Sequence, residues 1–247
     1  MKITILTIFP EMFESVLNSS ILGRAREQGL IEVECVDIRP FSDRKHKNTD
    51  DYPFGGGAGM VMLAQPIMDA MKHATGEDFS GRRIYMGPRG TTLTTAKARE
   101  LAKEEHLVLL CGHYEGVDQR ALDACIDEEI SIGDYILTGG ELAAMVLTDA
   151  VSRFIPGVLG SGESAEEESF SDGLLEYPQY TRPAVWHGRE IPAILTSGNH
   201  EKVRQWRRKQ SLRRTRERRP DMYEKLDLSS KQDKKLLKEM AEEDAAK

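Results

Sequence analysis

Apolar residues recur along the first two thirds of the chain with two different periods. Residues 3–9 form a short apolar run typical of a buried strand, and a run with helical spacing begins at Pro10. This alternation continues, with strands expected at 2–9, 31–38, 83–86, 107–111 and 130–132 and helices at 65–73, 95–103 and 141–154. Strands that alternate with helices predict an α/β domain with a parallel sheet up to about residue 155.

The last third of the chain has a different pattern, without predicted strands. Residues 156–176 are rich in Gly, Ser and Glu, a composition typical of a flexible linker. Helices are expected at 200–218, between Asn199 and Pro220, and at 231–243. The sequence therefore predicts an α/β domain of residues 1–160, a flexible acidic linker of 161–176 and a small all-helical domain of 177–247.

Charge is unevenly distributed, although the whole chain carries a formal net charge of −7. Between Lys202 and Arg219 there are ten Lys or Arg residues and one acid, Glu217, whereas acids cluster between residues 163 and 176. A solvated surface is the usual explanation of a basic run. The near absence of balancing acids and the presence of Trp206 favour a helix that neutralises phosphates, and therefore an RNA partner.

Several classes of protein are disfavoured by what the sequence lacks. The first apolar run is too short for a signal peptide, and no later stretch is long enough to span a bilayer. The three cysteines are scattered, which favours a reducing, cytoplasmic location over a disulfide framework or a zinc site. No G-x-G-x-x-G follows the first strand, and neither a P-loop nor the H-E-x-x-H motif of metal hydrolases is present.

Three predicted strands end directly in glycine-rich loops, at residues 87–90, 112–116 and 132–140. Ligands of open α/β sheets bind at the carboxyl ends of strands, and glycine lets backbone groups approach a ligand closely. Each loop taken alone is better explained as an ordinary tight turn. Three of them on one sheet edge favour a site for a nucleotide-like cofactor, and thus a small-ligand enzyme with a basic helical appendage.

Five motifs are more specific than any single loop. In chain order they are GGGAGM at 55–60, GHYEGVDQR at 112–120, SIGDYILTGGE at 131–141, YPQYTRP at 177–183 and SGNH at 197–200. Together they resemble the bacterial tRNA (guanine-N1)-methyltransferases over nearly all of the chain before Asp221. The resemblance implies transfer of a methyl group from S-adenosylmethionine to N1 of the guanine immediately 3′ of the tRNA anticodon.

The resemblance also implies a fold and an assembly. It implies a SPOUT-type parallel sheet with a deep trefoil knot, which is an exception to the general rule that chains do not thread loops. It also implies a homodimer with shared active sites. The partner is then a tRNA anticodon stem-loop, and the cofactor is S-adenosylmethionine. The resemblance also suggests that magnesium assists the reaction, although the sequence contains no recognisable set of metal ligands. Matched motif by motif, the cofactor-binding residues are Met86, Gly87, Pro88, Gly112, Tyr114, Glu115, Gly116, Ser131, Ile132, Gly133, Asp134, Tyr135, Leu137, Gly139 and Gly140.

The reaction needs a base for the hydrogen on N1 of guanine and a cationic or hydrogen-bonding partner for charge on O6. The resemblance assigns the base to Glu168, where the family usually has aspartate, the cation to Arg153 and an assisting role to Glu115. Glu167 and Asp172 are rivals for the base, and any acid in this run can instead belong to a solvated linker. Arg153 also stands four residues after Asp149 in a predicted helix, which is the spacing of a surface ion pair.

Candidate RNA-binding residues lie in two parts of the chain. His46 and Asp50 lie in the polar loop before the first glycine motif, and Gly59 belongs to that motif. The alternative is that all three are ordinary turn residues. The basic run supplies Arg207, Arg208, Arg213 and Arg214. Because N1 lies on the Watson–Crick edge, the target must be unpaired. Two other functions stay open, namely methylation of another RNA atom such as a ribose 2′-hydroxyl, and RNA binding without catalysis.

Overall fold

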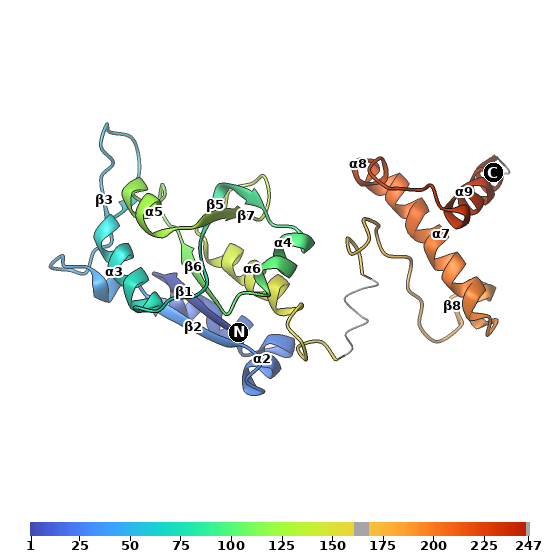
Figure 1. The fold of residues 1–247 in the computed structure, drawn as a ribbon, viewed down its shortest axis with the longest axis horizontal. Coiled ribbons are helices and arrows are strands. Elements are labelled where there is room, and N and C mark those ends of the chain that lie inside the picture. The colour runs from blue at the N-terminus through green and yellow to red at the C-terminus, as the bar shows by residue number, and fades with distance from the viewer. Residues whose placement is uncertain (161–167, 246–247) are drawn as a thin grey trace. The chain divides into compact units, whose positions relative to one another are not determined.

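The computed structural model describes residues 1–160 and 168–245 (Figure 1). The chain divides into two compact units, Met1–Gly162 and Glu163–Lys247. Each unit has its own hydrophobic core, which is larger in the first unit. Among the helices of the described residues, none is long and apolar enough to cross a membrane.

The first unit is built on a five-stranded sheet in which every neighbouring pair of strands is parallel. In spatial order the strands are β2 (Glu32–Asp37), β1 (Lys2–Thr7), β6 (His106–Cys111), β5 (Arg82–Thr92) and β7 (Glu128–Ser131). The inner strands β1 and β6 are buried on both faces, which explains their continuous apolar sequences. The prediction of an α/β domain with a parallel sheet is confirmed.

Helices cover both faces of this sheet. On one face lie α2 (Ser20–Glu27), α4 (Thr95–Leu101) and α6 (Glu141–Ser152), which pack against Ile3, Ile5 and Leu109. On the other face lie α3 (Ala64–Thr75) and α5 (Gln119–Cys125), which pack against Leu6, Val108 and Leu110. Alternate residues of one strand therefore enter separate cores. The shorter elements are η1 (Pro10–Phe13), α1 (Glu14–Leu17), η2 (Arg39–Phe41), β3 (Asp50–Asp51) and β4 (Val61–Met62).

Some observed elements of this unit differ from the predicted ones. The strand expected at 83–86 is only the first part of β5, which continues to Thr92 through an irregularity between Met86 and Thr91. That irregularity contains Gly90, where a Cβ atom would lie 2.2 Å from the backbone of Glu129 in β7. The glycines that suggested a strand end thus allow β5 to bend and then pair with β7 again. Helix α5, which was not predicted, begins after the capping residue Asp118.

The second unit is mostly helical. It contains η4 (Ala193–Thr196), α7 (His200–Arg218), α8 (Pro220–Tyr223) and α9 (Lys231–Ala245). The Asn199 side chain caps α7 by accepting a hydrogen bond from the Lys202 N–H at 3.0 Å, as its position before the helix predicts. A small core joins α7 to α9 and is formed by Leu174, Leu212, Leu236 and Met240.

The expectation of an all-helical second unit is wrong in one respect. Val185–Trp186 (β8) and Arg189–Glu190 (β9) pair as a short antiparallel hairpin. The two turn residues, His187 and Gly188, both have positive φ, which matches the twist of a tight hairpin turn. Strands of two residues are too short to produce a recognisable alternation in the sequence.

Part of the segment expected as a linker lies against α7. The Leu175 N–H donates a hydrogen bond to Thr215 Oγ1 at 2.9 Å, and Leu174 is only 3% exposed. The Asp172 carboxylate accepts a hydrogen bond from Arg208 at 2.7 Å. Residues 168–176 are therefore packed on the second unit, whereas residues 161–167 lie outside the described part of the chain.

Candidate active site

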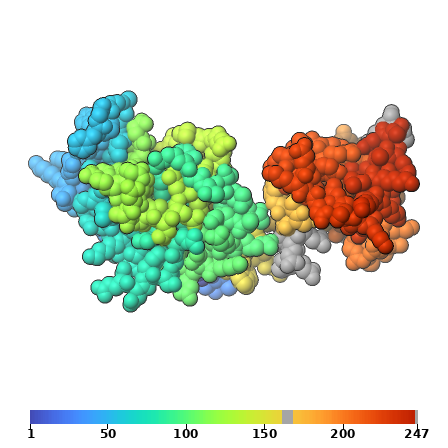
Figure 2. Space-filling view, turned by 45° about the horizontal axis from the view of Figure 1, so that its top comes forward, coloured from blue at the N-terminus to red at the C-terminus, as the bar shows by residue number. Residues whose placement is uncertain are grey.

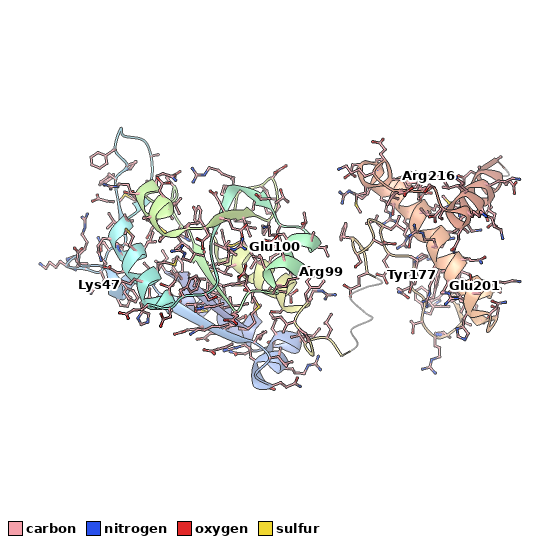
Figure 3. The ribbon with its side chains drawn as sticks, in the orientation of Figure 1. Lys47, Arg99, Glu100, Tyr177, Glu201 and Arg216 are labelled. Atoms are coloured by element: carbon pink, nitrogen blue, oxygen red, sulfur yellow. The ribbon has the colours of Figure 1, made fainter. Side chains whose placement is uncertain are left out.

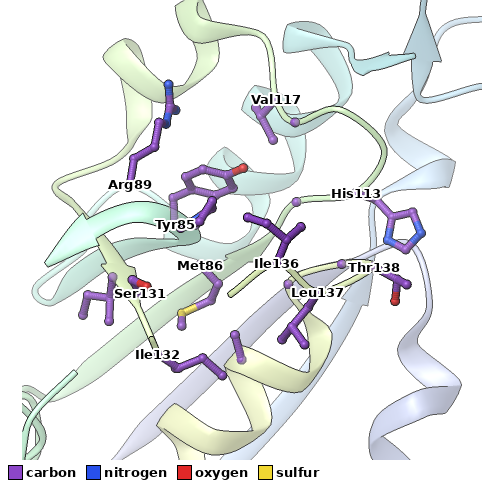
Figure 4. Close-up of a pocket in the computed structure, with 18 of the residues that line it drawn as sticks. Tyr85, Met86, Arg89, His113, Val117, Ser131, Ile132, Ile136, Leu137 and Thr138 are labelled. Atoms are coloured by element: carbon purple, nitrogen blue, oxygen red, sulfur yellow. The ribbon is translucent and has the colours of Figure 1, made fainter. Parts of the chain in front are cut away.

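The three glycine-rich loops meet at the edge of the sheet and surround an open cavity of about 520 Å³ (Figure 4). In Figure 4 the side chain of Met86, from β5, and those of Ile132 and Leu137, from the 132–140 loop, gather around the same space. The cavity is lined by Tyr85, Met86, Gly87, Pro88, Arg89, Gly112, His113, Tyr114, Glu115, Gly116, Val117, Gln119, Ile130, Ser131, Ile132, Gly133, Tyr135, Ile136, Leu137, Thr138, Gly139, Gly140 and Ala143.

All of the predicted cofactor-binding residues except Asp134 line this cavity, although their binding of a cofactor stays a prediction. Asp134 is exposed on the same loop. Tyr85 and Arg89 also line the cavity, although they were not among the predicted residues; Arg89 lies within the 87–90 loop, and Tyr85 lies two residues before it. His113, which stands inside the second glycine motif, lines the cavity as well.

Backbone contacts hold two of the loops together. The Gly140 N–H donates to the Gly112 carbonyl at 2.8 Å, and His113 and Gly139 form an isolated antiparallel bridge. A Cβ atom at Gly140 would lie 2.8 Å from the Cα atom of Cys111. Because φ of Gly140 is −79°, glycine is required here by the close approach of two backbones and not by an unusual conformation.

The Glu129 side chain supports the 87–90 loop. Its Oε1 accepts a hydrogen bond from the Arg89 N–H at 3.2 Å, and a Cβ atom at Gly87 would lie 2.3 Å from the same oxygen. The Arg89 Nε atom is 3.6 Å from this carboxylate, but the Arg89 side chain is 64% exposed. An ion pair with one side so exposed stabilises the fold weakly, so the guanidinium can exchange this partner for another anion.

Two phenols that line the cavity, and a buried thiol beside it, are neutral near pH 7. Burial raises the pKa of Tyr85, and burial together with the nearby Asp50 raises the pKa of Tyr114. Complete burial raises the pKa of Cys111 well above its ordinary value. In residues 1–160 and 168–245, no group of three or more His, Cys, Asp or Glu side chains is placed to hold a metal ion.

The loop between β3 and β4 meets the cavity at one side. The Glu115 N–H donates to the Met60 carbonyl at 2.9 Å, and a Cβ atom at Gly59 would lie 2.5 Å from Glu115 Cγ. The nearby Asp50 raises the pKa of Tyr114, so a predicted RNA-binding residue and a predicted cofactor-binding residue are neighbours. His46 is exposed between η2 and β3. Figure 2 shows the sky-blue atoms of the segment around residue 50 projecting from the first unit.

The predicted catalytic residues Arg153 and Glu168 belong to different units. Arg153 is the C-cap residue of α6 and is half-buried. Glu168 lines a cavity of about 220 Å³ in the second unit, together with Arg204, Arg207 and Arg208 of α7. The rival Glu167 lies outside the described residues, and the rival Asp172 is paired with Arg208 at 2.7 Å.

The basic residues of α7 differ in their partners. Arg208, Lys209, Arg213 and Arg216 form ion pairs with the α9 carboxylates of Asp233, Glu239, Glu243 and Asp244. Figure 3 shows Arg216 at the end of α7 that lies near α9. Hydrogen bonds from Lys209 and Arg213 lower the pKa of Glu243 to about 2.

The other two predicted RNA-binding arginines of α7 have different surroundings. The Arg207 guanidinium stacks over the Tyr177 ring, with its Cζ atom 4.7 Å from the ring centroid. Arg214 donates to the Glu176 carbonyl at 3.5 Å, a contact that does not neutralise its charge. Arg208 and Arg213 are thus paired with acids, whereas Arg214 contacts a backbone carbonyl.

Comparison with known proteins identifies one family. The profile of the family described as tRNA (Guanine-1)-methyltransferase TrmD matches residues 1–225. The tRNA (guanine-N(1)-)-methyltransferase of Clostridium perfringens is 57% identical over 238 residues, which cover 96% of this chain and 99% of the relative. Proteins of the same name from Geobacillus kaustophilus and Moorella thermoacetica are 56% and 55% identical over 243 residues, 98% of this chain and 99% and 97% of the relatives.

These matches confirm the resemblance that the five motifs indicated. The family profile spans the whole first unit and continues through α7 and α8. The chain therefore belongs to the tRNA (guanine-1)-methyltransferase family of the SPOUT superfamily, a family of S-adenosylmethionine-dependent enzymes of tRNA modification.

Proposed function

We propose that this protein transfers the methyl group of S-adenosylmethionine to N1 of the guanine immediately 3′ of a tRNA anticodon. The observation that carries the proposal is the cavity where three glycine loops meet at one edge of a parallel sheet. Open α/β sheets bind small ligands at such edges. The names of the relatives support N1 of a tRNA guanine as the acceptor atom.

The loops around the cavity fit a nucleoside cofactor. At Gly139 and Gly140 a Cβ atom would lie 2.3 Å and 2.8 Å from its nearest neighbours, so these backbones are packed where side chains are excluded. Backbone N–H and C=O groups of such loops can read an adenine edge, while Ile132 and Leu137 offer apolar contact. The bound cofactor supplies an electrophilic methyl group, and we assign its binding to residues 86–88, 112–116, 131–137, 139 and 140.

The acceptor guanine needs a base and a partner for developing charge. Glu168 of the partner subunit would accept the N1 proton, and Arg153 would compensate negative charge on O6. The bound cofactor would supply the methyl group, with its sulfur–methyl bond breaking and S-adenosylhomocysteine leaving. Glu115, on the cavity wall, assists. A homodimer is supported by Leu142 and Val146 of α6, which are 48% and 46% exposed and would be covered by a second subunit.

The proposal also includes the deep trefoil knot that characterises the superfamily. Its support in this chain is the contact of the 132–140 loop with the earlier 112–116 loop through Gly140 and Gly112. We place the enzyme in the cytoplasm because its tRNA substrate is found there. Assistance by magnesium is proposed from the family resemblance alone.

Primer extension tests the reaction directly. After treatment of tRNA with the protein and S-adenosylmethionine, reverse transcriptase is expected to stop before the guanine 3′ of the anticodon, because an N1 methyl group blocks Watson–Crick pairing. A tRNA with adenine at that position is the control and is expected to give no stop. A methylated product without a stop would indicate another acceptor atom, such as a ribose 2′-hydroxyl, and would contradict the proposal.

Arginines of α7 are expected to contribute unequally to tRNA binding. Arg214→Gln should weaken binding several-fold and reduce the slope of log K against log salt by about 0.7–0.9, because it removes one phosphate contact. Arg213→Gln should have a smaller effect, since its charge is already paired with Glu243 and Asp244. Lys103→Gln, an exposed change on the first unit, is the control. Equal effects of Arg213→Gln and Arg214→Gln in a salt series would contradict this division.

A further inference from the structure

A buried carboxylate that the proposed reaction does not use lies directly beneath the cofactor loops. Glu141, the first residue of α6, is 2% exposed. Its Oε1 accepts a hydrogen bond from Thr7 Oγ1 at 2.8 Å, and its Oε2 is 3.6 Å from His113 Nδ1. These three residues come from β1, from the loop after β6 and from the start of α6, so they join distant parts of the chain.

A carboxylate in such a place needs compensation, because burial of an ionised group without partners is costly. The Thr7 hydroxyl provides one hydrogen bond, and the N-terminal end of the 12-residue α6 favours a negative charge there. Thr7 itself is fully buried. A hydrophobic residue could fill this position without these requirements, which suggests that the carboxylate has a role of its own.

The Glu141 carboxylate is in close contact with the backbone that closes the cavity. A Cβ atom at Gly139 would lie 2.3 Å from Glu141 Oε2 and 2.4 Å from His113 Nδ1. His113 and Gly139 are joined by an antiparallel bridge, and both residues line the cavity. Figure 4 shows the His113 side chain beside the stretch that contains Leu137 and Thr138. Carboxylate, imidazole and glycine backbone therefore form one packed cluster.

The His113 ring is oriented by its neighbours. Its Nδ1 atom is buried and, among the residues that the structure describes, has no hydrogen-bond partner within ordinary distance, yet it faces Glu141 Oε2. Phe9 and Tyr114 pack on the ring, with centroid distances of 5.0 Å and 5.3 Å. A shift of roughly 0.4–0.6 Å would convert the Nδ1 to Oε2 contact into a hydrogen bond. The carboxylate is thus positioned to fix the 112–116 loop against Gly139.

We propose that Glu141 is a positioning residue for cofactor binding, acting through His113 and Gly139. Held by Thr7, its carboxylate fixes the separation of the 112–116 and 137–140 loops, between which the cofactor binds. The proposal rests on the proposed function, because it concerns the affinity for S-adenosylmethionine. Because the Glu141 side chain is only 2% exposed, it is not accessible to the acceptor guanine, and its effect should be confined to the cofactor.

The test uses the full-length protein and separates cofactor binding from chemistry. Glu141→Gln is expected to raise the Kd and KM for S-adenosylmethionine about tenfold, because the amide has the shape of the carboxylate but lacks its charge. The kcat at saturating cofactor and the Kd for tRNA should stay within twofold of wild type. Glu34→Gln, a similar change on the exposed side of β2, is the control.

A second pair of variants tests the same cluster through Thr7. Thr7→Val removes the hydroxyl while keeping the side-chain volume. Like Glu141→Gln, it should raise the Kd for S-adenosylmethionine. Thr7→Ser keeps the hydroxyl and should restore an affinity near that of wild type. In a His113→Phe background, Glu141→Gln should have little further effect, because the two residues act through one contact.

Several outcomes would overturn the proposal. If Glu141→Gln lowers only the melting temperature, or lowers kcat without changing the KM for S-adenosylmethionine, the residue does not position the cofactor loops. Equal affinities of Thr7→Val and Thr7→Ser would contradict the role of the hydroxyl. A wild-type protein that fails to bind S-adenosylmethionine would instead contradict the proposed function, so the two failures are distinguishable.

Discussion

Glu168→Ala is expected to reduce the rate of the methyl-transfer step by about 10²–10⁴-fold, the usual cost of losing a general base. Both ligands should still bind, because Glu168 lies in the second unit and does not line the 520 Å³ cavity of the first. Single-turnover measurements at saturating S-adenosylmethionine and tRNA isolate this step. Glu168→Asp should retain much of the rate, since the family usually has aspartate there.

Asp172→Asn is the matched control for this variant. Asp172 lies four residues from Glu168 and is paired with Arg208, so its loss should affect the packing of residues 168–176 more than the chemistry. If Glu168→Ala is fully active, Glu167 or Asp172 becomes the better candidate for the base. Arg153→Ala should resemble Glu168→Ala if the two side chains serve the same guanine.

A mixture of two inactive variants tests the shared site. Heterodimers of Gly140→Arg and Glu168→Ala would contain one site with an intact cofactor loop from one chain and an intact Glu168 from the other. Activity is therefore expected to return when subunits exchange. Its level should not exceed the fraction of all sites in the mixture that combine the intact cofactor loop with the intact Glu168. Heterodimers that form but stay inactive would show that each active site is built from a single chain.

Gly140→Arg is expected to abolish binding of S-adenosylmethionine. Even the first carbon of a side chain at this position would lie 2.8 Å from Cys111 Cα and 3.0 Å from the Gly112 nitrogen, and these are backbone atoms of a fully buried strand end. They cannot move away as the end of a flexible side chain can. Calorimetric titration measures the loss, and circular dichroism verifies that the variant is folded.

Alanine variants provide a graded form of the same experiment. Gly140→Ala adds only the Cβ atom and should already weaken cofactor binding. Gly160→Ala is the control, because no atom of the described residues lies within 4 Å of a Cβ atom there. Unchanged affinity in a folded Gly140→Arg protein would contradict the assignment of this loop to the cofactor. Equal losses in Gly140→Ala and Gly160→Ala would indicate a general effect on the fold.

The first unit was largely predictable because its signals are local. The apolar run at 107–111 indicated a buried parallel strand, and β6 is that strand. Glycines after three strands indicated a common edge, and the three loops do line one cavity. Among the predicted cofactor-binding residues, Asp134 does not line the cavity, whereas its neighbours Gly133 and Tyr135 do, because a motif gives the order of residues but not which of them face a cavity.

The second unit shows where local signals fail. The excess of arginine in α7 was visible in the sequence, but the acids that pair with it belong to α9. Arg213, for example, pairs with Glu243, thirty residues further along the chain. Sequence spacing identifies ion pairs within one helix, where the distance is fixed, but not between helices that meet by packing. The β8–β9 hairpin was missed because its strands have two residues each.

The sequence by itself determined the family, the parallel sheet and the glycine loops, because these depend on residue order and on the short periods of strands and helices. Only the tertiary structure decided that Gly140 lies against Gly112, that Glu141 faces His113 and Thr7, and that α9 covers part of α7. These contacts join residues that are 28 to 134 positions apart. Their partners are fixed by the path of the chain between strands, which no local pattern of residues specifies.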